Sequence, residues 1–99
     1  MTARLTLASA FTVYQAPELQ KQLLQALDDA RGELQLDGSC VHELDGAGVQ
    51  ILLALAKEAQ RRDIALPLHA PSPTLLGTLR MLGLTGRFRM LDVAAEAVP

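Results

Sequence analysis

Aromatic residues are scarce in this 99-residue chain, which has no tryptophan, two phenylalanines and one tyrosine. A core without many rings must be built from Leu, Ala, Val and Ile in closely packed layers. Because 49% of the residues are apolar, the chain has enough of them to close the core of one domain. We therefore expect residues 1–99 to form a single domain.

Cysteine and long apolar runs are also missing. Cys40 is the single cysteine, which excludes an internal disulfide and a cysteine-rich metal site and agrees with a reducing compartment. No stretch approaches the apolar length of a membrane span, and the first residues lack the apolar segment of a secretory signal. The sequence predicts a cytoplasmic protein that does not insert into membranes.

An excess of positive charge is absent too. Nine basic residues stand against eleven acidic ones, so the formal net charge is -2. Binding to nucleic acid requires a basic surface that neutralises phosphates. The composition therefore argues against a nucleic-acid partner.

No motif in the sequence is typical of catalysis. There is no HExxH metal motif, no glycine-rich phosphate loop and no CxxC pair. Cys40, His42 and His69 could meet at the carboxyl ends of parallel strands, but packing roles explain them better. Turn and capping roles likewise explain Asp37 and Asp45. We expect no enzymatic activity, no catalytic residue, no metal and no cofactor.

Alternation of polar and apolar residues predicts short strands, which lie at residues 4–14 (one or two strands), 33–37, 64–68 and 87–91. Pro67 cannot donate a ladder hydrogen bond, so it predicts an edge-like or terminal position in its strand. Gly38 and Ser39 supply a turn, and a short connection follows at residues 40–42.

Helical spacing of apolar residues predicts helices, which lie at residues 17–30, 45–62, 73–82 and 93–98. Asp45 and Ser72 suit the N-cap position, and Pro17 and Pro73 suit a first helical turn. Strand, helix and strand over residues 34–68 form a βαβ unit, whose crossover should be right-handed and whose strands should be parallel. The fold class is therefore α/β, a small mixed β-sheet with helices packed on it.

The helix at residues 45–62 has two contrasting faces. One apolar stripe is predicted to face the sheet and comprises Val49, Leu52, Leu53, Ala56 and Ala59. The opposite face is small at first and basic later, and comprises Ala47, Gln50, Ala54, Lys57 and Arg61. Ile51 and Leu55 fall on one flank, where they would be partly exposed or covered by the next helix. This outward face is a docking surface or an ordinary solvated face, and the sequence leaves both open.

The junction before this helix carries two glycines. Gly46 and Gly48 leave the backbone bare around Ala47, which permits a tight turn or lets another chain approach closely. Structural need and partner access both remain open for each glycine.

Two segments resemble the signature of the STAS domain, namely Leu34-Gln35-Leu36-Asp37-Gly38-Ser39 and Leu44-Asp45-Gly46-Ala47-Gly48-Val49-Gln50-Ile51-Leu52. Family members show an apolar strand ending in Asp, a short loop, and then Asp-Ser-Ser-Gly or Asp-Thr-Gly-Gly at the start of a long helix. The likeness extends to residues 16–19, 63–68 and 75–84, so it covers nearly the whole chain. The resemblance implies a STAS-like fold and a function in protein binding.

Stand-alone anti-sigma factor antagonists resemble this chain in size and layout. In them, an anti-sigma kinase phosphorylates a serine or threonine at the position that is Ala47 here. Because alanine has no hydroxyl, phosphorylation at Ala47 is chemically impossible, and Gly46 replaces the other hydroxyl of the family pattern. Ser39 is the nearest remaining hydroxyl, although a turn role explains it better.

The resemblance implies three alternative binding functions. The favoured one is a regulatory module, similar to an anti-sigma factor antagonist, that docks on a kinase-type regulator. The others are a STAS subunit of a bacterial phospholipid-transport ABC complex, which binds its ATPase, and a STAS module of a chemotaxis-like pathway. The expected partner-binding residues surround the start of the helix and comprise Asp45, Gly46, Ala47, Gly48, Gln50, Ile51, Ala54 and Lys57. The partner's identity, the oligomeric state and the binding of a small ligand or lipid remain open.

Overall fold

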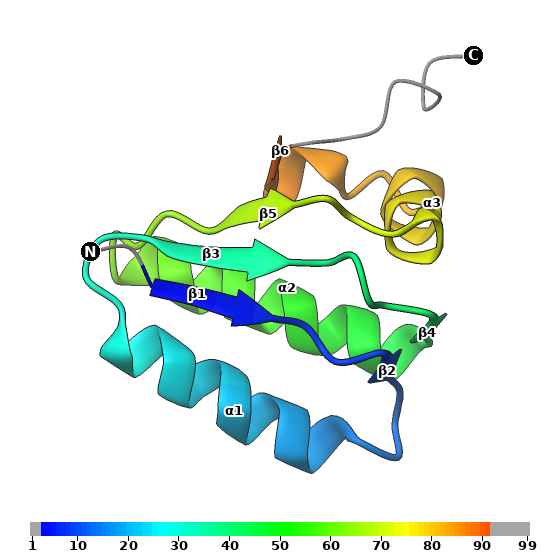
Figure 1. Ribbon diagram of the computed structural model, residues 1–99, viewed down its shortest axis with the longest axis horizontal. Coiled ribbons are helices and arrows are strands. Elements are labelled where there is room, and N and C mark those ends of the chain that lie inside the picture. Colours follow the sequence, from blue (N-terminus) through cyan, green and yellow to red (C-terminus); the bar gives the residue numbers. More distant parts are fainter. Residues whose placement is uncertain (1–2, 92–99) are drawn as a thin grey trace.

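A computed structural model describes residues 3–91, in which each α-helix follows one or two short strands along the chain (Figure 1). The strands are β1 (Ala3–Thr6), β2 (Ala10–Phe11), β3 (Leu34–Asp37), β4 (Glu43–Leu44), β5 (Pro67–His69) and β6 (Arg89–Leu91). The helices are α1 (Ala16–Asp29), α2 (Gly46–Arg61), α3 (Pro73–Met81) and the short 3-10 helix η1 (Thr85–Arg87). The helix predicted at residues 93–98 lies outside the described residues.

One sheet contains four of the strands, in the order β1-β3-β5-β6, with neighbours running parallel. The short strands β2 and β4 form a separate parallel pair beyond the carboxyl ends of β1 and β3 (Figure 1). The predicted α/β class is confirmed. The prediction of a mixed sheet is wrong, because every pairing between the described strands is parallel. Parallel neighbours require crossovers, and α1, α2 and α3 lie within those crossovers.

The helices α1 and α2 lie side by side against the sheet, with α1 also in contact with β1 (Figure 1). Because the strand order follows the chain order, crossovers of the same hand bring α1 and α2 to the same face. The core is mostly leucine, as expected for a chain with few rings, and its largest fully buried members include Leu7, Phe11, Leu27, Leu34, Leu36, Leu75 and Leu79.

Most predicted elements have the expected places. The helix predicted at residues 45–62 is α2, and Pro67 is the first residue of β5, a terminal ladder position in a central strand. Strand β4 was not predicted, because its two residues are too short to show alternation. The region at residues 4–14 forms two strands rather than one.

The predicted orientation of α2 is partly wrong. Val49, Leu52 and Ala59 are buried as expected, but Leu53 and Ala56 are half-buried. Leu55, which was assigned to the flank, is only 3% exposed. The reason is that α1 packs against that flank of α2, so the buried arc of the helix is turned toward α1. The covering helix is therefore the preceding one rather than the next one.

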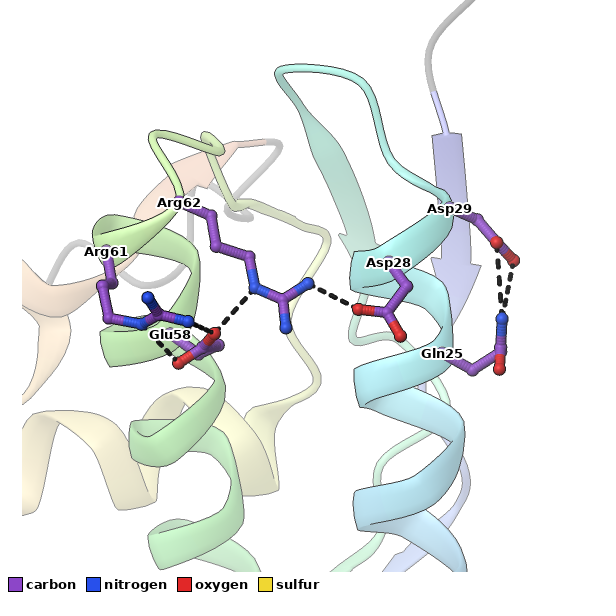
Figure 2. A network of polar contacts seen from close by, with 6 residues as sticks. All are labelled: Gln25, Asp28, Asp29, Glu58, Arg61 and Arg62. Carbon is purple, nitrogen blue, oxygen red and sulfur yellow. Dashed lines mark hydrogen bonds and ion pairs between the residues drawn. The ribbon is translucent and has the colours of Figure 1, made fainter.

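Ion pairs join the last turn of α2 to α1, as Figure 2 shows. Arg62 donates from Nε to Glu58 at 2.7 Å and from Nη1 to Asp28 of α1 at 2.6 Å. Hydrogen bonds from Arg61 and Arg62 lower the pKa of Glu58 to about 2, so this carboxylate is charged at neutral pH. Because these groups are partly or largely exposed, the network orients the two helix ends and contributes little to stability.

Ser72 fixes the start of α3. Its side chain is buried, and its hydroxyl donates to the carbonyl of Val41 at 2.5 Å while accepting from the N–H of Leu75 at 3.1 Å. The predicted N-cap is therefore confirmed. The same hydroxyl also ties α3 to the loop that follows β3.

Replacing Ser72→Ala removes both hydrogen bonds and leaves the buried carbonyl of Val41 without this donor. We expect the free energy of unfolding to fall by about 1–3 kcal/mol. Urea denaturation followed by circular dichroism measures the loss. Thr74→Ala, which removes an exposed hydroxyl from the first turn of the same helix, is the control and should change stability by about 0.5 kcal/mol or less. Equal losses in the two variants would contradict the role of the cap.

Candidate functional site

The carboxylate of Asp45 fixes the start of α2. Its Oδ1 accepts a hydrogen bond from the N–H of Gly48 at 3.0 Å, which is the predicted N-cap bond. Its Oδ2 accepts from the N–H of Val13 at 3.0 Å, in the turn between β2 and α1. The backbone N–H of Asp45 also donates to the carbonyl of Phe11 at 3.2 Å. One residue thus joins the helix start to β2 and to the turn after it.

These bonds alter the acidity of Asp45. The N–H of Gly48 and, after it, the N–H of Val13 stabilise the charged form and hold the pKa of this carboxyl below its ordinary value of 3.8. The positive end of the α2 dipole favours the same charge. Asp45 therefore carries a fixed negative charge at the helix start at neutral pH.

The two glycines of the junction have different surroundings. Gly48 is buried, and a Cβ on it would lie 2.0 Å from the carbonyl oxygen of Phe11. The missing side chain of Gly48 is therefore needed for packing against Phe11 within the chain. Of the two roles that the sequence left open for this glycine, the structural one applies. Gly46 is exposed, and a Cβ there would meet nothing within 4 Å. Of the two, Gly46 is the one that another protein can reach.

The other predicted binding residues lie on one side of α2. Gln50, Ala54 and Lys57 are exposed as expected, whereas Ala47 and Ile51 are half-buried. We define the docking face as Gly46, Ala47, Gln50, Ile51, Ala54 and Lys57. A small groove between α1 and α2 adjoins this face, and it is lined by Gln20, Leu23, Leu24, Ile51, Ala54 and Leu55.

Two exposed apolar residues beside the docking face were missed at the sequence level. Val13 is 58% exposed and Tyr14 is 89% exposed. They lie in the turn that the carboxylate of Asp45 holds through the N–H of Val13. Alternation placed both in a strand, although Pro17 shortly afterwards is a signal that the chain must turn first. An exposed aromatic ring beside a fixed surface is typical of a binding anchor.

Ser39 lies in a turn, as the sequence indicated. Its N–H and hydroxyl both donate to Oδ1 of Asp37, at 3.0 and 2.7 Å. These bonds, the N–H first, lower the pKa of Asp37, which also forms an ion pair of 3.7 Å with Arg4. Both side chains of the turn are therefore engaged in shaping it.

The structure also bears on metal binding and on membrane insertion. Within residues 3–91, no three His, Cys, Asp or Glu side chains are grouped so that they could hold a metal ion. The thiol of Cys40 is exposed and free, and His42 is exposed. Across the part of the chain that the structure describes, no helix combines the length and apolar character that a membrane crossing requires.

Comparison with known proteins identifies relatives of this fold. The family model described as Mlab, STAS domain matches residues 1–92. No curated protein matches the chain. Similar solved structures include TM1081 from Thermotoga maritima, assigned as an anti-sigma factor antagonist, with 17% identity and a TM-score of 0.79 over 95% of this chain and 81% of that one.

Two further structures show the same arrangement. The anti-sigma factor antagonist SpoIIAA in its unphosphorylated form is 18% identical, with a TM-score of 0.71 over 98% of this chain and 85% of that one. A sulfate transporter family protein from Wolinella succinogenes is 20% identical, with a TM-score of 0.76 over 97% of this chain and 80% of that one. At these identities the structural likeness is one of fold.

The contrast between the glycines predicts opposite effects of one substitution. Gly48→Ala forces the new methyl group against the Phe11 backbone, so we expect a loss of about 1–3 kcal/mol in the free energy of unfolding. Gly46→Ala places the same methyl group in open space and should be neutral or stabilising by up to about 1 kcal/mol. Thermal unfolding of the two variants measures both effects. Equal stability of the two would show that the close approach is not a constraint.

The pH dependence of stability tests the charge on Asp45. Because its folded-state pKa is lowered, the charged carboxylate stabilises the fold above the ordinary pKa of 3.8, and this contribution is lost as the pH falls through the lowered value. Asp45→Asn keeps a capping oxygen but removes the charge. We expect the wild type to be more stable than this variant at about pH 6, with the difference shrinking toward about pH 2. Thermal unfolding of both proteins across this pH range measures the difference in stability. A difference that stayed constant would show that the charge of Asp45 does not stabilise the fold.

Proposed function

Because the chain belongs to the STAS domain family, we propose that it is a non-enzymatic regulatory module that acts by binding another protein through the start of α2. The observation that carries this proposal is the docking face, which is small and open and lies beside the exposed Val13 and Tyr14. The hydrogen bonds of Asp45 hold the start of α2 and the turn with Val13 and Tyr14 in place. A surface held in one arrangement before binding loses less entropy when a partner docks.

The composition of the docking face suits a protein partner. Exposed Ala54 and half-buried Ile51 give a shallow apolar centre, and the exposed Lys57 supplies a polar rim. Protein interfaces commonly combine an apolar centre with a polar rim and an aromatic anchor. Tyr14 fits the role of that anchor because 89% of it is exposed in the free chain.

Docking on this face is constitutive in our proposal. The side chain of Ala47 is a half-buried methyl group that cannot be phosphorylated. In a protein with serine there, phosphorylation would add nearly two negative charges beside the carboxylate at the helix start. Since that switch is absent, the availability of the partner controls binding. The favoured partner is a kinase-type regulator of the anti-sigma class, because the sequence resembles stand-alone anti-sigma factor antagonists in size and layout.

The missing hydroxyl at Ala47 also favours a second candidate function. A STAS subunit of a phospholipid-transport ABC complex binds its ATPase without depending on a phosphoserine. The same docking face would then contact the ATPase. A cytoplasmic location is part of both proposals, and the free thiol of Cys40 agrees with it.

Capture of the partner by the tagged chain in its native cells tests the docking face. Ala54→Arg and Ala47→Glu introduce bulk and charge on this face, and we expect each to reduce capture about tenfold or more. Gln22→Arg, at an exposed position on α1, adds a charge away from this face and should leave capture unchanged. Circular dichroism confirms that the variants are folded.

The identity of the captured protein separates the candidate functions. A kinase-type regulator supports the first candidate, and a lipid-transport ATPase supports the second. A chemotaxis protein would replace both. If the two variants on the docking face capture the partner as well as Gln22→Arg does, binding does not use the start of α2 and the proposal is wrong.

A further inference from the structure

A second surface lies at the other end of α2. An open groove of about 770 Å³ runs between the second half of α2, the segment that leads into β5, and the region of η1 and β6. This volume falls within the range of small-molecule sites, roughly 300–1,000 Å³. The groove is separate from the start of α2, and of the docking face only Lys57 also lines it.

Positive charge gathers in this groove. Lys57, Arg87 and Arg89 line it, and all three are exposed. Among the described residues no ion pair involves these three, whereas Arg61 and Arg62 are paired with carboxylates. Among the described residues that line the groove, Asp63 is the acidic one, so three positive charges stand against one negative charge there. In a chain whose formal net charge is -2, this excess is local.

The rest of the lining is mainly aliphatic. Ile64, Leu66 and Pro67 contribute apolar side chains from the segment before and at the start of β5, and two alanines do so from α2. No aromatic side chain lines the groove within the described residues, so a base or another flat ring would find nothing to stack on. The lining thus matches a ligand with a charged group and an aliphatic body.

We propose that this groove binds an organic anion, a carboxylate or a phosphate carried on an aliphatic chain. Arg87 and Arg89 bind the anionic group, because guanidinium groups present paired donors that fit carboxylate and phosphate oxygens. Lys57 adds a third positive charge from α2. The aliphatic chain covers Ile64 and Leu66, which are only half-buried in the free protein. This site extends beyond the proposed docking function and does not depend on it.

Titration of the isotope-labelled whole chain with simple probes, followed by NMR, tests the site. The probes are decanoate, decyl phosphate, decanol and inorganic phosphate. Decanoate and decyl phosphate are kept below the concentrations at which they form micelles, and decanol is kept below its solubility limit. We expect decanoate, decyl phosphate or both to shift the amide signals of Ile64, Leu66 and Arg89. Decanol lacks the anionic group and inorganic phosphate lacks the aliphatic chain. Each should therefore bind at least about tenfold more weakly than the anionic amphiphiles. The stronger of the two anions identifies the anionic group.

Paired substitutions separate this site from non-specific binding. Arg87→Gln with Arg89→Gln should weaken binding of the anionic amphiphile about tenfold or more. Arg31→Gln with Arg80→Gln makes the same change in charge at exposed arginines outside the groove and should leave the affinity unchanged.

Four results would overturn the proposal. The first is the absence of shifts with both anionic amphiphiles, and the second is equal binding by the two double variants. Equal binding of decanol would show that the groove selects only apolar chains, and equal binding of inorganic phosphate would show that it takes only the charge.

Discussion

The close approach of Gly48 to the backbone of Phe11 is the constraint on which the position of α2 depends. Only a residue without a Cβ lets the helix lie this near to β2, and the N–H of Asp45 then reaches the Phe11 carbonyl. The Asp45 carboxylate in turn holds the next part of the chain through Val13. Strands β2 and β4 have two residues each, which is too short for a stable ladder of their own. The contacts of this junction therefore hold them in place more than the hydrogen bonds between the two strands do.

The sequence predicted the features that local chemistry determines. The caps at Asp45 and Ser72 depend on a side chain and a backbone N–H three positions away, so both were recognisable. The orientation of α2 was only partly predictable. A helical wheel shows which residues share a face, but it does not show that α1 covers the flank that contains Leu55. Tertiary packing supplied that information.

The candidate site, like the orientation of α2, was only partly predictable from the sequence. The exposed side of α2, with Gln50 and Ala54, followed from the period of the helix. The turn that carries Tyr14 is held by a hydrogen bond between residues 32 positions apart, Val13 and Asp45, which no local pattern contains. The basic groove likewise combines Lys57 with Arg87 and Arg89, which are distant in sequence, and only the fold brings them together.

Helix α2 is attached at both ends, by Asp45 and Gly48 at its start and by Arg62 and Glu58 at its end. The attachment at the start includes the buried Gly48, whereas the ion pairs at the end are partly or largely exposed and orient the helix with little stabilisation. The two ends are also linked by charge, since Lys57 contributes its charge both to the docking face and to the groove.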